Sequence, residues 1–330
     1  MRAVVEQCAD FGCTAVFFQV RGNGTVAYPS RVEVWSESFG FADPGFDPLA
    51  TAIAAGRARG VAVHAWVNVT PGWRGKDEPR DPRQLYRARP GWFLADSSGQ
   101  RESLERGGYL GLNPCLPEVR DYLATLCLEV AATPGLAGLH LDYVRFTSGD
   151  FEGIDEFPND RATRKAFEGA RGREVGEAAL RRFKVDCVTD LVRAIGTKVR
   201  VRAPGLTLSA AVLSDPERAL ASGQAWPEWA RAGLVDALVP MAYTDDDAEF
   251  GQQLATLRAQ AGRCSLIVGL GIYKHADAAQ TVRQMQAVRR AGAAGVALFG
   301  YGELAKPERA ETAEAVRARW HRARGESAPR

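Results

Sequence analysis

The chain has 330 residues, a formal net charge of +2 at pH 7, and a composition that is 46% hydrophobic and 25% charged. This length is sufficient for one large α/β barrel or for two ordinary domains. A net charge close to zero gives no indication of a nucleic-acid partner. No run of about 18 apolar residues predicts a membrane span, and the first residues lack the apolar segment of a signal peptide. The six cysteines form no C-x-x-C pair, which argues against a zinc ribbon or a thioredoxin-like site.

Short apolar strands alternate with amphipathic helices along most of the chain. The predicted strands cover residues 14–20, 61–67, 136–142, 207–213, 237–243, 265–272 and 295–301. The predicted helices cover residues 4–11, 48–59, 117–132, 174–195, 247–261, 276–291 and 307–324. This alternation predicts parallel strands joined by right-handed crossovers.

Seven strands are one fewer than a (β/α)8 barrel contains. The chain opens with a helix where a barrel has its first strand, so we predict a (β/α)8 TIM barrel that lacks its first strand in this chain. Such a gap exposes two strand edges, and we expect an upstream-extended chain to be more stable. A flavodoxin-like doubly wound sheet is the alternative, but no glycine-rich phosphate loop follows the first predicted strand.

A single domain is predicted over residues 1–316, followed by a basic C-terminal tail over residues 317–330. The loops that enter strands are short, whereas those that leave strands are long and cover residues 69–112, 146–173 and 214–227. In a barrel, the loops that leave strands form the catalytic face. We therefore expect the functional residues at the C-terminal ends of the strands.

The predicted strand over residues 136–142 carries the most informative side chains. His140 and Asp142 share one of its faces, because side chains alternate along a strand, and apolar residues occupy the other face. A carboxylate within an apolar strand requires partners or a role. Asp142 is therefore the central candidate, and Tyr143 and Arg145 follow it where the chain leaves the sheet.

The same alternation places further polar and aromatic side chains at the barrel top. The inward residues that we take as binding candidates, besides His140, Tyr143 and Arg145, are Gln19, Arg21, His64, Trp66, Asn68, Met241, Tyr243 and Tyr301. Structural interpretations stay open for some of them. Gln19 and Arg21 could pair with a buried carboxylate, with Asp142 as one possibility. His64 could be a core histidine, and Trp66 could serve packing alone.

A series of motifs resembles the glycosyl-hydrolase-like 10 family. In chain order they are FQVRGNG (18–24), YPS (28–30), FDPL (46–49), HAWVN (64–68), LNP (112–114), PEVR (117–120), GLHLDYVRF (138–146), LSAAV (208–212), QAWP (224–227), VPMAYT (239–244) and LFGYG (298–302). The resemblance covers nearly the whole chain. It departs from the family at Ala225, where Asp is common, and at Thr147, where Tyr-Pro is common after the phenylalanine.

This resemblance implies a glycosidase-type barrel that binds an oligo- or polysaccharide, or a cell-wall-type glycan, and uses no cofactor. It adds Asn113 and Trp226 to the binding candidates. The resemblance also suggests an extracytoplasmic or secreted protein.

Hydrolysis of a glycosidic bond usually requires two carboxyl groups. We assign Asp142 as the nucleophile or stabilising carboxylate, because a nearby arginine would lower its pKa. Candidates for the second carboxylate lie just beyond strand ends and are Asp245 and Glu303, together with Asp215 and Asp246. One carboxylate suffices if an N-acetyl group of the substrate attacks. A chitinase is not predicted, because Val144 stands where the acid of a chitinase-type pattern belongs.

Two alternative functions stay open. The lack of an evident second carboxylate favours a non-catalytic glycan-binding barrel. A metal-dependent barrel enzyme would use His64, His140 and Asp142 as ligands. This second alternative is weaker, because both histidines lie one layer below Asp142 and no further histidine is near in the predicted strands.

Overall fold

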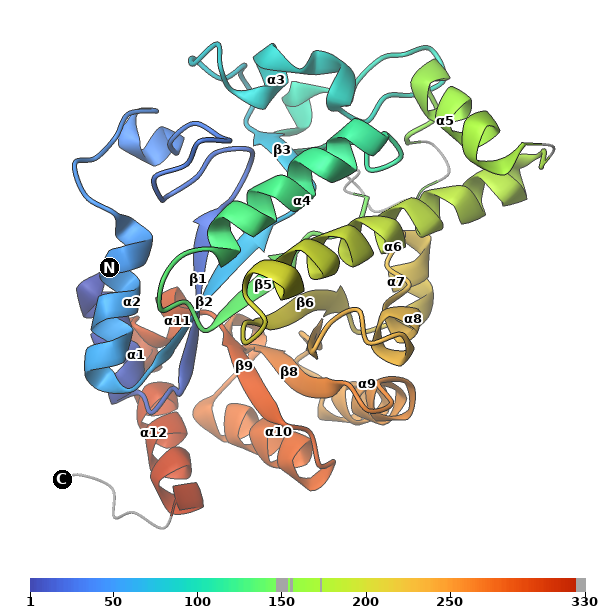
Figure 1. Cartoon of the computed structure of the whole chain (residues 1–330). Helices are drawn as coiled ribbons and strands as arrows, with labels where there is room; N and C mark the ends of the chain where they lie inside the picture. The colour runs from blue at the N-terminus through green and yellow to red at the C-terminus, as the bar shows by residue number, and fades with distance from the viewer. Residues whose placement is uncertain (147–153, 155–156, 173, 325–330) are drawn as a thin grey trace.

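The computed structural model describes residues 1–146, 154, 157–172 and 174–324. Its main feature is one curled sheet of seven parallel strands in the order β1-β2-β5-β6-β7-β8-β9, with helices on the outer side (Figure 1). The strands are β1 (Ala15–Arg21), β2 (Ala62–Asn68), β5 (Gly138–Asp142), β6 (Thr207–Leu213), β7 (Ala237–Met241), β8 (Ser265–Gly271) and β9 (Gly295–Phe299). All seven predicted strands are present, each within two residues of its predicted bounds. The α/β class and the parallel order are confirmed.

The sheet is a half-barrel with two ends rather than a closed barrel. Its end strands are β1 and β9, and in the part of the chain that the structure describes no strand pairs with their outer edges. We call the interval between these two edges the open seam. Every residue of the interior strand β5 is buried, whereas most residues of β1 and β9 are half-buried or exposed.

The N-terminal helix α1 (Arg2–Asp10) lies beside the open seam. It packs against α2 (Pro48–Arg59). The hydroxyl of Tyr301, which follows β9, donates a hydrogen bond of 2.6 Å to Gln7 Oε1 of α1. This contact joins the N-terminal helix to the segment that follows β9. The Tyr301 hydroxyl therefore has a structural partner.

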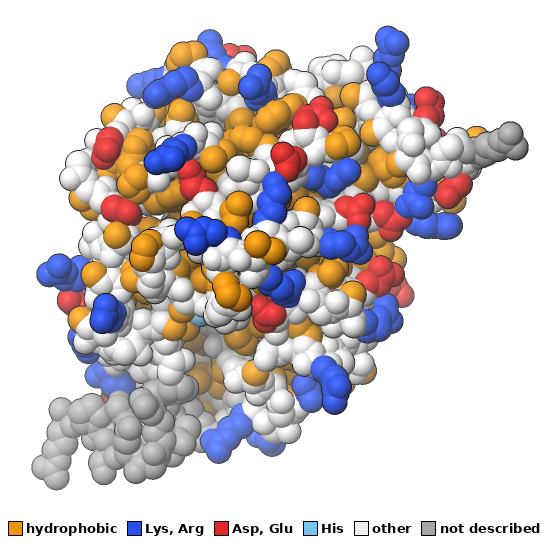
Figure 2. All heavy atoms as spheres, viewed as in Figure 1, with side chains coloured by type: hydrophobic (Ala, Val, Ile, Leu, Met, Phe, Trp, Pro, Cys, Tyr) orange, Lys and Arg blue, Asp and Glu red, His pale blue; other side chains and the backbone are white. Residues whose placement is uncertain are grey.

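The helices begin and end where the sequence supplies caps. Asp47 accepts a hydrogen bond from the Ala50 N–H at the start of α2, and Gly60 ends that helix in the left-handed conformation. The other helices are α3 (Leu85–Ala88), α4 (Pro117–Ala131), α5 (Arg161–Arg171), α6 (Glu177–Arg202), α7 (Pro216–Ala221), α8 (Trp226–Arg231), α9 (Asp247–Gln260), α10 (Ala278–Arg290), α11 (Tyr301–Leu304) and α12 (Ala310–Arg324). Helices α4 and α6 pack side by side over the sheet (Figure 1). Charges of both signs are interspersed on this face (Figure 2).

The long loops contain small elements that the sequence pattern did not indicate. Strands β3 (Pro71–Arg74) and β4 (Tyr109–Gly111) form an antiparallel pair within residues 69–112. Helix α5 lies within residues 146–173, and α7 and α8 begin within residues 214–227. Strands of three or four residues are too short to give a readable alternation.

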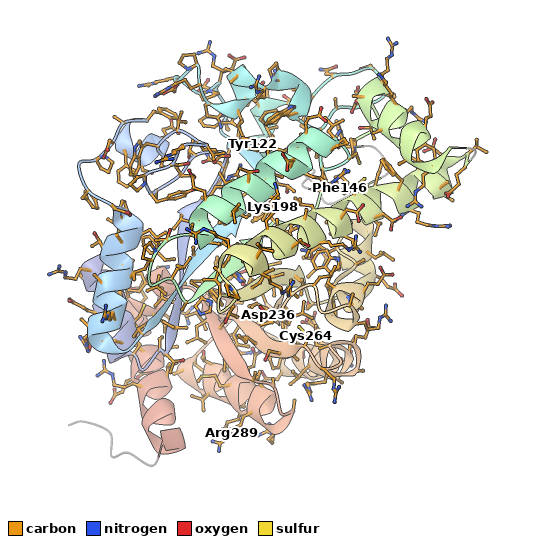
Figure 3. The ribbon with its side chains drawn as sticks, viewed as in Figure 1. Tyr122, Phe146, Lys198, Asp236, Cys264 and Arg289 are labelled. Carbon is orange, nitrogen blue, oxygen red and sulfur yellow. The ribbon has the colours of Figure 1, made fainter. Side chains whose placement is uncertain are left out.

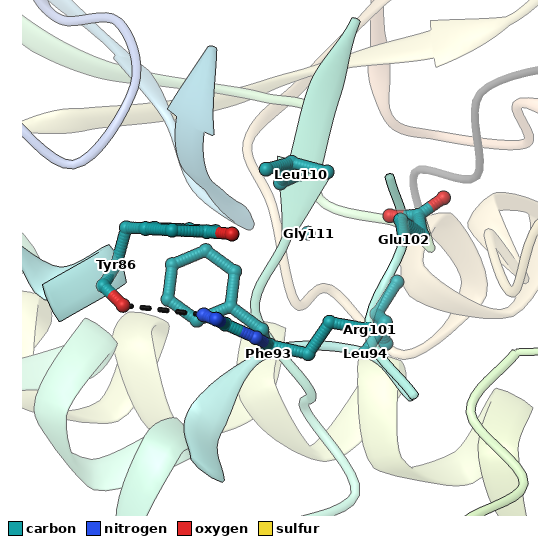
Figure 4. A pocket seen from close by; sticks show the side chains of 7 residues that line it. All are labelled: Tyr86, Phe93, Leu94, Arg101, Glu102, Leu110 and Gly111. Atoms are coloured by element: carbon teal, nitrogen blue, oxygen red, sulfur yellow. Dashed lines mark hydrogen bonds between the residues drawn. The ribbon is translucent and has the colours of Figure 1, made fainter. Parts of the chain in front are cut away.

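A small pocket lies next to β4, within the loop segment that contains β3 and β4 (Figure 4). The guanidinium of Arg101 lies 4.1 Å from the ring centre of Tyr86 and donates a hydrogen bond of 3.2 Å to the Tyr86 carbonyl. The ring of Phe93 packs edge-on against Tyr86, at 5.5 Å. The long loop after β2 is therefore a small folded unit.

Helix α12 includes residues 317–324, so this part of the segment expected as a tail is helical. Residues 325–330 of that segment, and part of the loop over residues 146–173, lie outside the described residues. Within the described residues, no helix is both long and apolar enough to cross a membrane. The six cysteines are free thiols.

Candidate active site

Asp142 is the last residue of β5 and lies at the C-terminal mouth of the sheet. Neighbouring β2 pairs with β5 in a register that sets Asn68 opposite Asp142. Asp142 is only 7% exposed. The N–H of Tyr143 donates a hydrogen bond of 2.6 Å to Asp142 Oδ1. The strand thus places the Asp142 carboxylate, which accepts a hydrogen bond from the next backbone N–H, at the C-terminal strand ends. Barrel enzymes have their catalytic residues at this end of the sheet.

Burial is the main influence on the charge of Asp142. Desolvation raises the pKa of Asp142, and Arg145, whose Nη1 lies 3.9 Å from Oδ1, lowers it by less. The Tyr143 amide and the Trp66 indole lower the pKa further, but the net direction is upward. The expectation that a nearby arginine holds this pKa low is therefore wrong. The raised pKa suits a carboxyl group that keeps and donates a proton.

The turn after Asp142 is fixed by a threonine of the neighbouring strand end. Tyr143 has a positive φ of 50°, which is rare for a bulky residue. Thr70 Oγ1 lies 2.6 Å from the Tyr143 carbonyl oxygen and 2.7 Å from the Arg145 carbonyl oxygen, so its single hydroxyl proton is shared between these two acceptors. The Arg145 guanidinium lies 4.3 Å from the ring centre of Tyr143, and the Tyr109 ring packs against that ring at 4.9 Å. These contacts hold Arg145 beside Asp142.

Asn68 orients the tryptophan next to Asp142. Its Oδ1 accepts hydrogen bonds from Trp66 Nε1 (2.8 Å) and Gln19 Nε2 (3.5 Å). Its Nδ2 donates to a carbonyl of the loop after β1 and to the Tyr109 hydroxyl. Gln19, Trp66 and Asn68 thus form one connected group at the mouth, as the alternation predicted.

Arg21 has a different partner from the one considered in the sequence. It is 1% exposed, and its Nη2 lies 2.7 Å from Glu33 Oε1. Its Nε also donates to Glu33, and its Nη1 donates to three backbone carbonyls, at residues 68, 69 and 71. The hydroxyl of Tyr122, on α4 (Figure 3), donates to Glu33 as well, at 3.1 Å. The buried carboxylate beside Arg21 is therefore Glu33 and not Asp142.

A histidine layer lies below the carboxylate. His140 is buried, and its Nδ1 is 2.9 Å from Ser209 Oγ. Its ring stacks on Phe17 at 4.1 Å, and the ring of His64 packs edge-on against Phe17 at 5.5 Å. Among the described residues, no group of three or more His, Cys, Asp or Glu side chains is placed to hold a metal ion. The two histidines pack in this layer with aromatic and hydroxyl neighbours.

We expect His140 to limit stability in acid. Burial lowers the pKa of His140 to about 3, and the neighbouring His64 adds to this effect. Between pH 6.5 and about 3, the unfolded chain binds a proton at this position that the folded chain excludes. The free energy of unfolding therefore falls as the pH is lowered through this window. In His140→Asn the fall between pH 7 and pH 4.5, measured by urea unfolding, should be smaller. An unchanged pH slope would contradict this assignment.

Gly138 makes room for the histidine layer. A Cβ atom there would lie 2.1 Å from His64 Nδ1 and 2.8 Å from the Thr207 carbonyl oxygen. We expect Gly138→Ala to lower the free energy of unfolding by about 1–3 kcal/mol, because overpacking forces side chains and backbone to shift. Gly91→Ala is the control, since a Cβ atom at residue 91 meets open space. Equal stability of the two variants in urea unfolding would count against this view.

The remaining binding candidates divide by exposure. Tyr243 and Met241 lie at the end of β7 and are half-buried. Trp226 is fully buried at the start of α8, and Asn113 is buried with its Nδ2 donating to Thr163 Oγ1 at 2.8 Å. The first two line the mouth, whereas Trp226 and Asn113 support the loops around it.

The candidates for a second carboxylate lie outside this buried group. Asp245 is exposed after β7, and Glu303 bonds Lys306 Nζ at 2.8 Å. Asp215 and Asp246 accept hydrogen bonds from the first backbone amides of α7 and α9. Of these carboxylates and Asp142, only Asp142 is buried at the mouth.

Sequence reasoning missed Glu33 and Tyr273. Glu33 lies in an irregular loop, where no periodicity reveals its direction. Tyr273 follows β8 in a short 3-10 turn, Ile272–Lys274. The sequence signal that could have indicated Tyr273 was the pair Gly269 and Gly271. These glycines leave room on one face of β8 for a large neighbouring side chain.

A curled parallel sheet with a buried carboxylate at a strand end and aromatic side chains around it is the arrangement of a barrel-type α/β protein. Residues 1–287 match the family described as Glycosyl hydrolase-like 10, and the chain belongs to this family. The family resemblance seen in the sequence is thereby confirmed.

Relatives of this chain with similar sequences are named as glycosyl hydrolases. The chain is 25% identical over 260 residues to the glycosyl hydrolase DigH of Escherichia coli strain K12, which covers 70% of this chain and 55% of DigH. It is 27% identical over 145 residues to the glycosyl hydrolase YngK of Bacillus subtilis strain 168, covering 42% of this chain and 26% of YngK. The chain thus spans about half the length of the relative DigH.

Solved structures share the fold. The glycoside hydrolase domain of PgaB (BpsB) from Bordetella bronchiseptica superimposes with a TM-score of 0.65 at 16% identity, covering 95% of this chain and 91% of that domain. The α-L-fucosidase isoenzyme 2 of Paenibacillus thiaminolyticus gives a TM-score of 0.70 at 15% identity, covering 98% of this chain and 46% of the fucosidase. At these identities the likeness concerns the fold.

Proposed function

We propose that this protein is a glycoside hydrolase that acts on a polysaccharide or cell-wall-type glycan, with Asp142 as the central catalytic carboxylate. The observation that carries this proposal is the buried position of Asp142 at the mouth of the sheet, beside Trp66 and Arg145. The family and the names of its relatives support the same class of activity. The family resemblance also favours an extracytoplasmic site of action.

The geometry favours proton donation by Asp142. The Tyr143 amide holds Oδ1, and burial keeps the carboxyl group protonated at a higher pH than usual. A protonated carboxyl group at this position transfers its proton to the oxygen of the departing sugar as the glycosidic bond breaks. This assignment replaces the role of nucleophile, which needs the ionised carboxylate that burial disfavours.

The second group of the reaction is Asp245 in this proposal. Its side chain is exposed after β7 and has no cation partner in the described part of the chain, whereas Glu303 is engaged by Lys306. A carboxylate that solvent can reach is placed to activate water. In an amino-sugar polymer, the N-acetyl group of the substrate takes this role instead.

The test is release of reducing ends from a panel of purified polysaccharides and bacterial cell-wall glycans. The intact chain should generate new reducing ends from at least one polymer, and Asp142→Asn should not. Absence of product from every polymer over long incubation would overturn the proposal.

A non-catalytic glycan-binding protein is the second candidate. The observation that favours it is that Asp142 alone, of the candidate carboxylates, is buried at the mouth. This candidate predicts oligosaccharide binding without any release of reducing ends.

A further inference from the structure

Three aromatic rings meet at the C-terminal ends of β7, β8 and β9. We call Tyr243, Tyr273 and Phe299 the aromatic wall. The rings of Tyr243 and Phe299 are stacked, with centroids 5.5 Å apart and planes at 14°. The Tyr273 ring lies 6.2 Å from each of them, nearly perpendicular to both. Three consecutive strands therefore contribute to one continuous aromatic surface.

Two of these rings are open to solvent. Tyr273 is 44% exposed and Phe299 is 43% exposed, while large apolar side chains in the described part of the chain are mostly buried. Exposed apolar side chains scattered singly require no explanation, but rings in contact with each other form a patch, and such patches mark binding sites. The aromatic wall is such a patch.

The backbone of β8 is shaped to hold this patch. A Cβ atom on Gly271 would lie 2.8 Å from Tyr243 Cβ and 3.1 Å from Tyr273 Cε1. A Cβ atom on Gly269 would lie 3.2 Å from Tyr243 Cε1. Both rings therefore rest against bare backbone, and any larger residue at 271 would displace them.

The aromatic wall is continuous with the site around Asp142. The ring of Phe299 lies 6.2 Å from that of Trp66, on β2. Strands β9 and β2 are far apart in the strand order, so a side chain of β9 reaches Trp66 only across the inside of the curled sheet. Trp66 in turn contacts Asp142. The negative charge of Asp142 contributes to raising the pKa of the Tyr243 hydroxyl.

We propose that the aromatic wall is a sugar-binding subsite, in which the Tyr273 ring stacks on the C–H face of a pyranose unit next to the bond at Asp142, and the Phe299 ring, nearly perpendicular to it, borders the same unit. This inference rests on the proposed function for the position of that bond. Flat rings bury the apolar face of a sugar, while the tyrosine hydroxyls stay available for its hydroxyl groups. The ligand is therefore a pyranose within a longer chain, and Tyr273 is a residue that determines affinity for it.

Binding to an inactive protein separates the subsite from catalysis. Isothermal titration calorimetry with Asp142→Asn as the parent would use three hexamers: β-1,4-linked N-acetylglucosamine hexamer, cellohexaose and maltohexaose. We expect at least one hexamer to bind, and Tyr273→Ala in this parent to weaken its affinity about tenfold, equal to ~1.4 kcal/mol. Tyr273→Phe keeps the ring and should bind within about twofold of the parent, since stacking supplies most of the affinity.

Phe46→Ala is the matched control. Phe46 is also an aromatic residue that is 43% exposed, but it lies outside the aromatic wall, just before α2. Its removal should leave the affinity unchanged. Equal affinity of Tyr273→Ala and the parent, or binding of none of the hexamers by the parent, would overturn the subsite. Failure of the proposed function has a separate signature, namely ring-dependent binding by a chain that releases no reducing ends.

Discussion

Asp142→Asn is expected to reduce the release of reducing ends by about a hundredfold to ten-thousandfold, because a positioned proton donor contributes roughly 10²–10⁴-fold to such reactions. The change is nearly isosteric. The Tyr143 amide, 2.6 Å from Oδ1 in the native protein, retains an oxygen acceptor in the variant. The measurement is the initial rate on a polymer that the native chain hydrolyses.

The same substitution should leave the fold as stable as before or more stable at pH 7. Burial raises the pKa of Asp142, so the folded chain holds this proton more tightly than the unfolded chain does. Stability linked to this group is therefore present at low pH and declines as the pH rises through the raised pKa. Asn removes that decline, and a lower melting temperature at pH 7 would contradict the burial argument.

Asp10→Asn serves as the control for activity. Asp10 forms a half-exposed pair with Arg59, on the opposite end of the strands from Asp142. Its replacement should leave the rate of hydrolysis unchanged. Full activity of Asp142→Asn on the same polymer would refute the catalytic role of Asp142.

Breaking the buried pair Arg21–Glu33 should give the largest loss of stability. We expect Arg21→Met or Glu33→Gln to lower the free energy of unfolding by about 3–5 kcal/mol, because each leaves a charge buried without its counterpart. Both side chains are at most 1% exposed. Urea unfolding at pH 7 measures the loss.

The double variant Arg21→Met/Glu33→Gln separates the ion pair from the rest of the network. It should lose clearly less than the sum of the single losses, because no unpaired charge is left. It should still be less stable than the native chain, since Arg21 also donates to carbonyls of the segment that follows β2. The exposed pair Arg59–Asp10 provides the comparison, and Arg59→Met should change stability by no more than about 1 kcal/mol. Additive losses at Arg21 and Glu33 would show that the two side chains do not act as a pair.

The sequence predicted those parts of the site that follow from strand periodicity. Alternation along β5 placed His140 and Asp142 on one face, and alternation along β2 placed Trp66 and Asn68 beside them. These features depend only on the backbone geometry of a strand, which any half-buried segment of this length obeys. The parallel order of the sheet followed from the alternation of strands with helices.

Other parts of the site depend on contacts between distant segments, and no local pattern encodes these. Glu33 reaches Arg21 through an irregular loop, so its role was not visible in the sequence. The sign of the pKa shift at Asp142 depends on how much solvent the surrounding loops exclude, compared with the attraction of Arg145. The exposure of Tyr273 and Phe299 likewise results from the packing of three strand ends.

The open seam divides the candidate site into two parts of unequal stiffness. Strand β5, which carries Asp142, is hydrogen-bonded on both sides, by β2 and β6. Strand β9, which carries Phe299, pairs among the described residues with β8 alone. Segments with fewer buried contacts open at lower free energy. Asp142, the proposed proton donor, is therefore held on a rigid strand. The aromatic wall lies beside an edge strand that can shift, so this part of the site can adjust to the bound glycan.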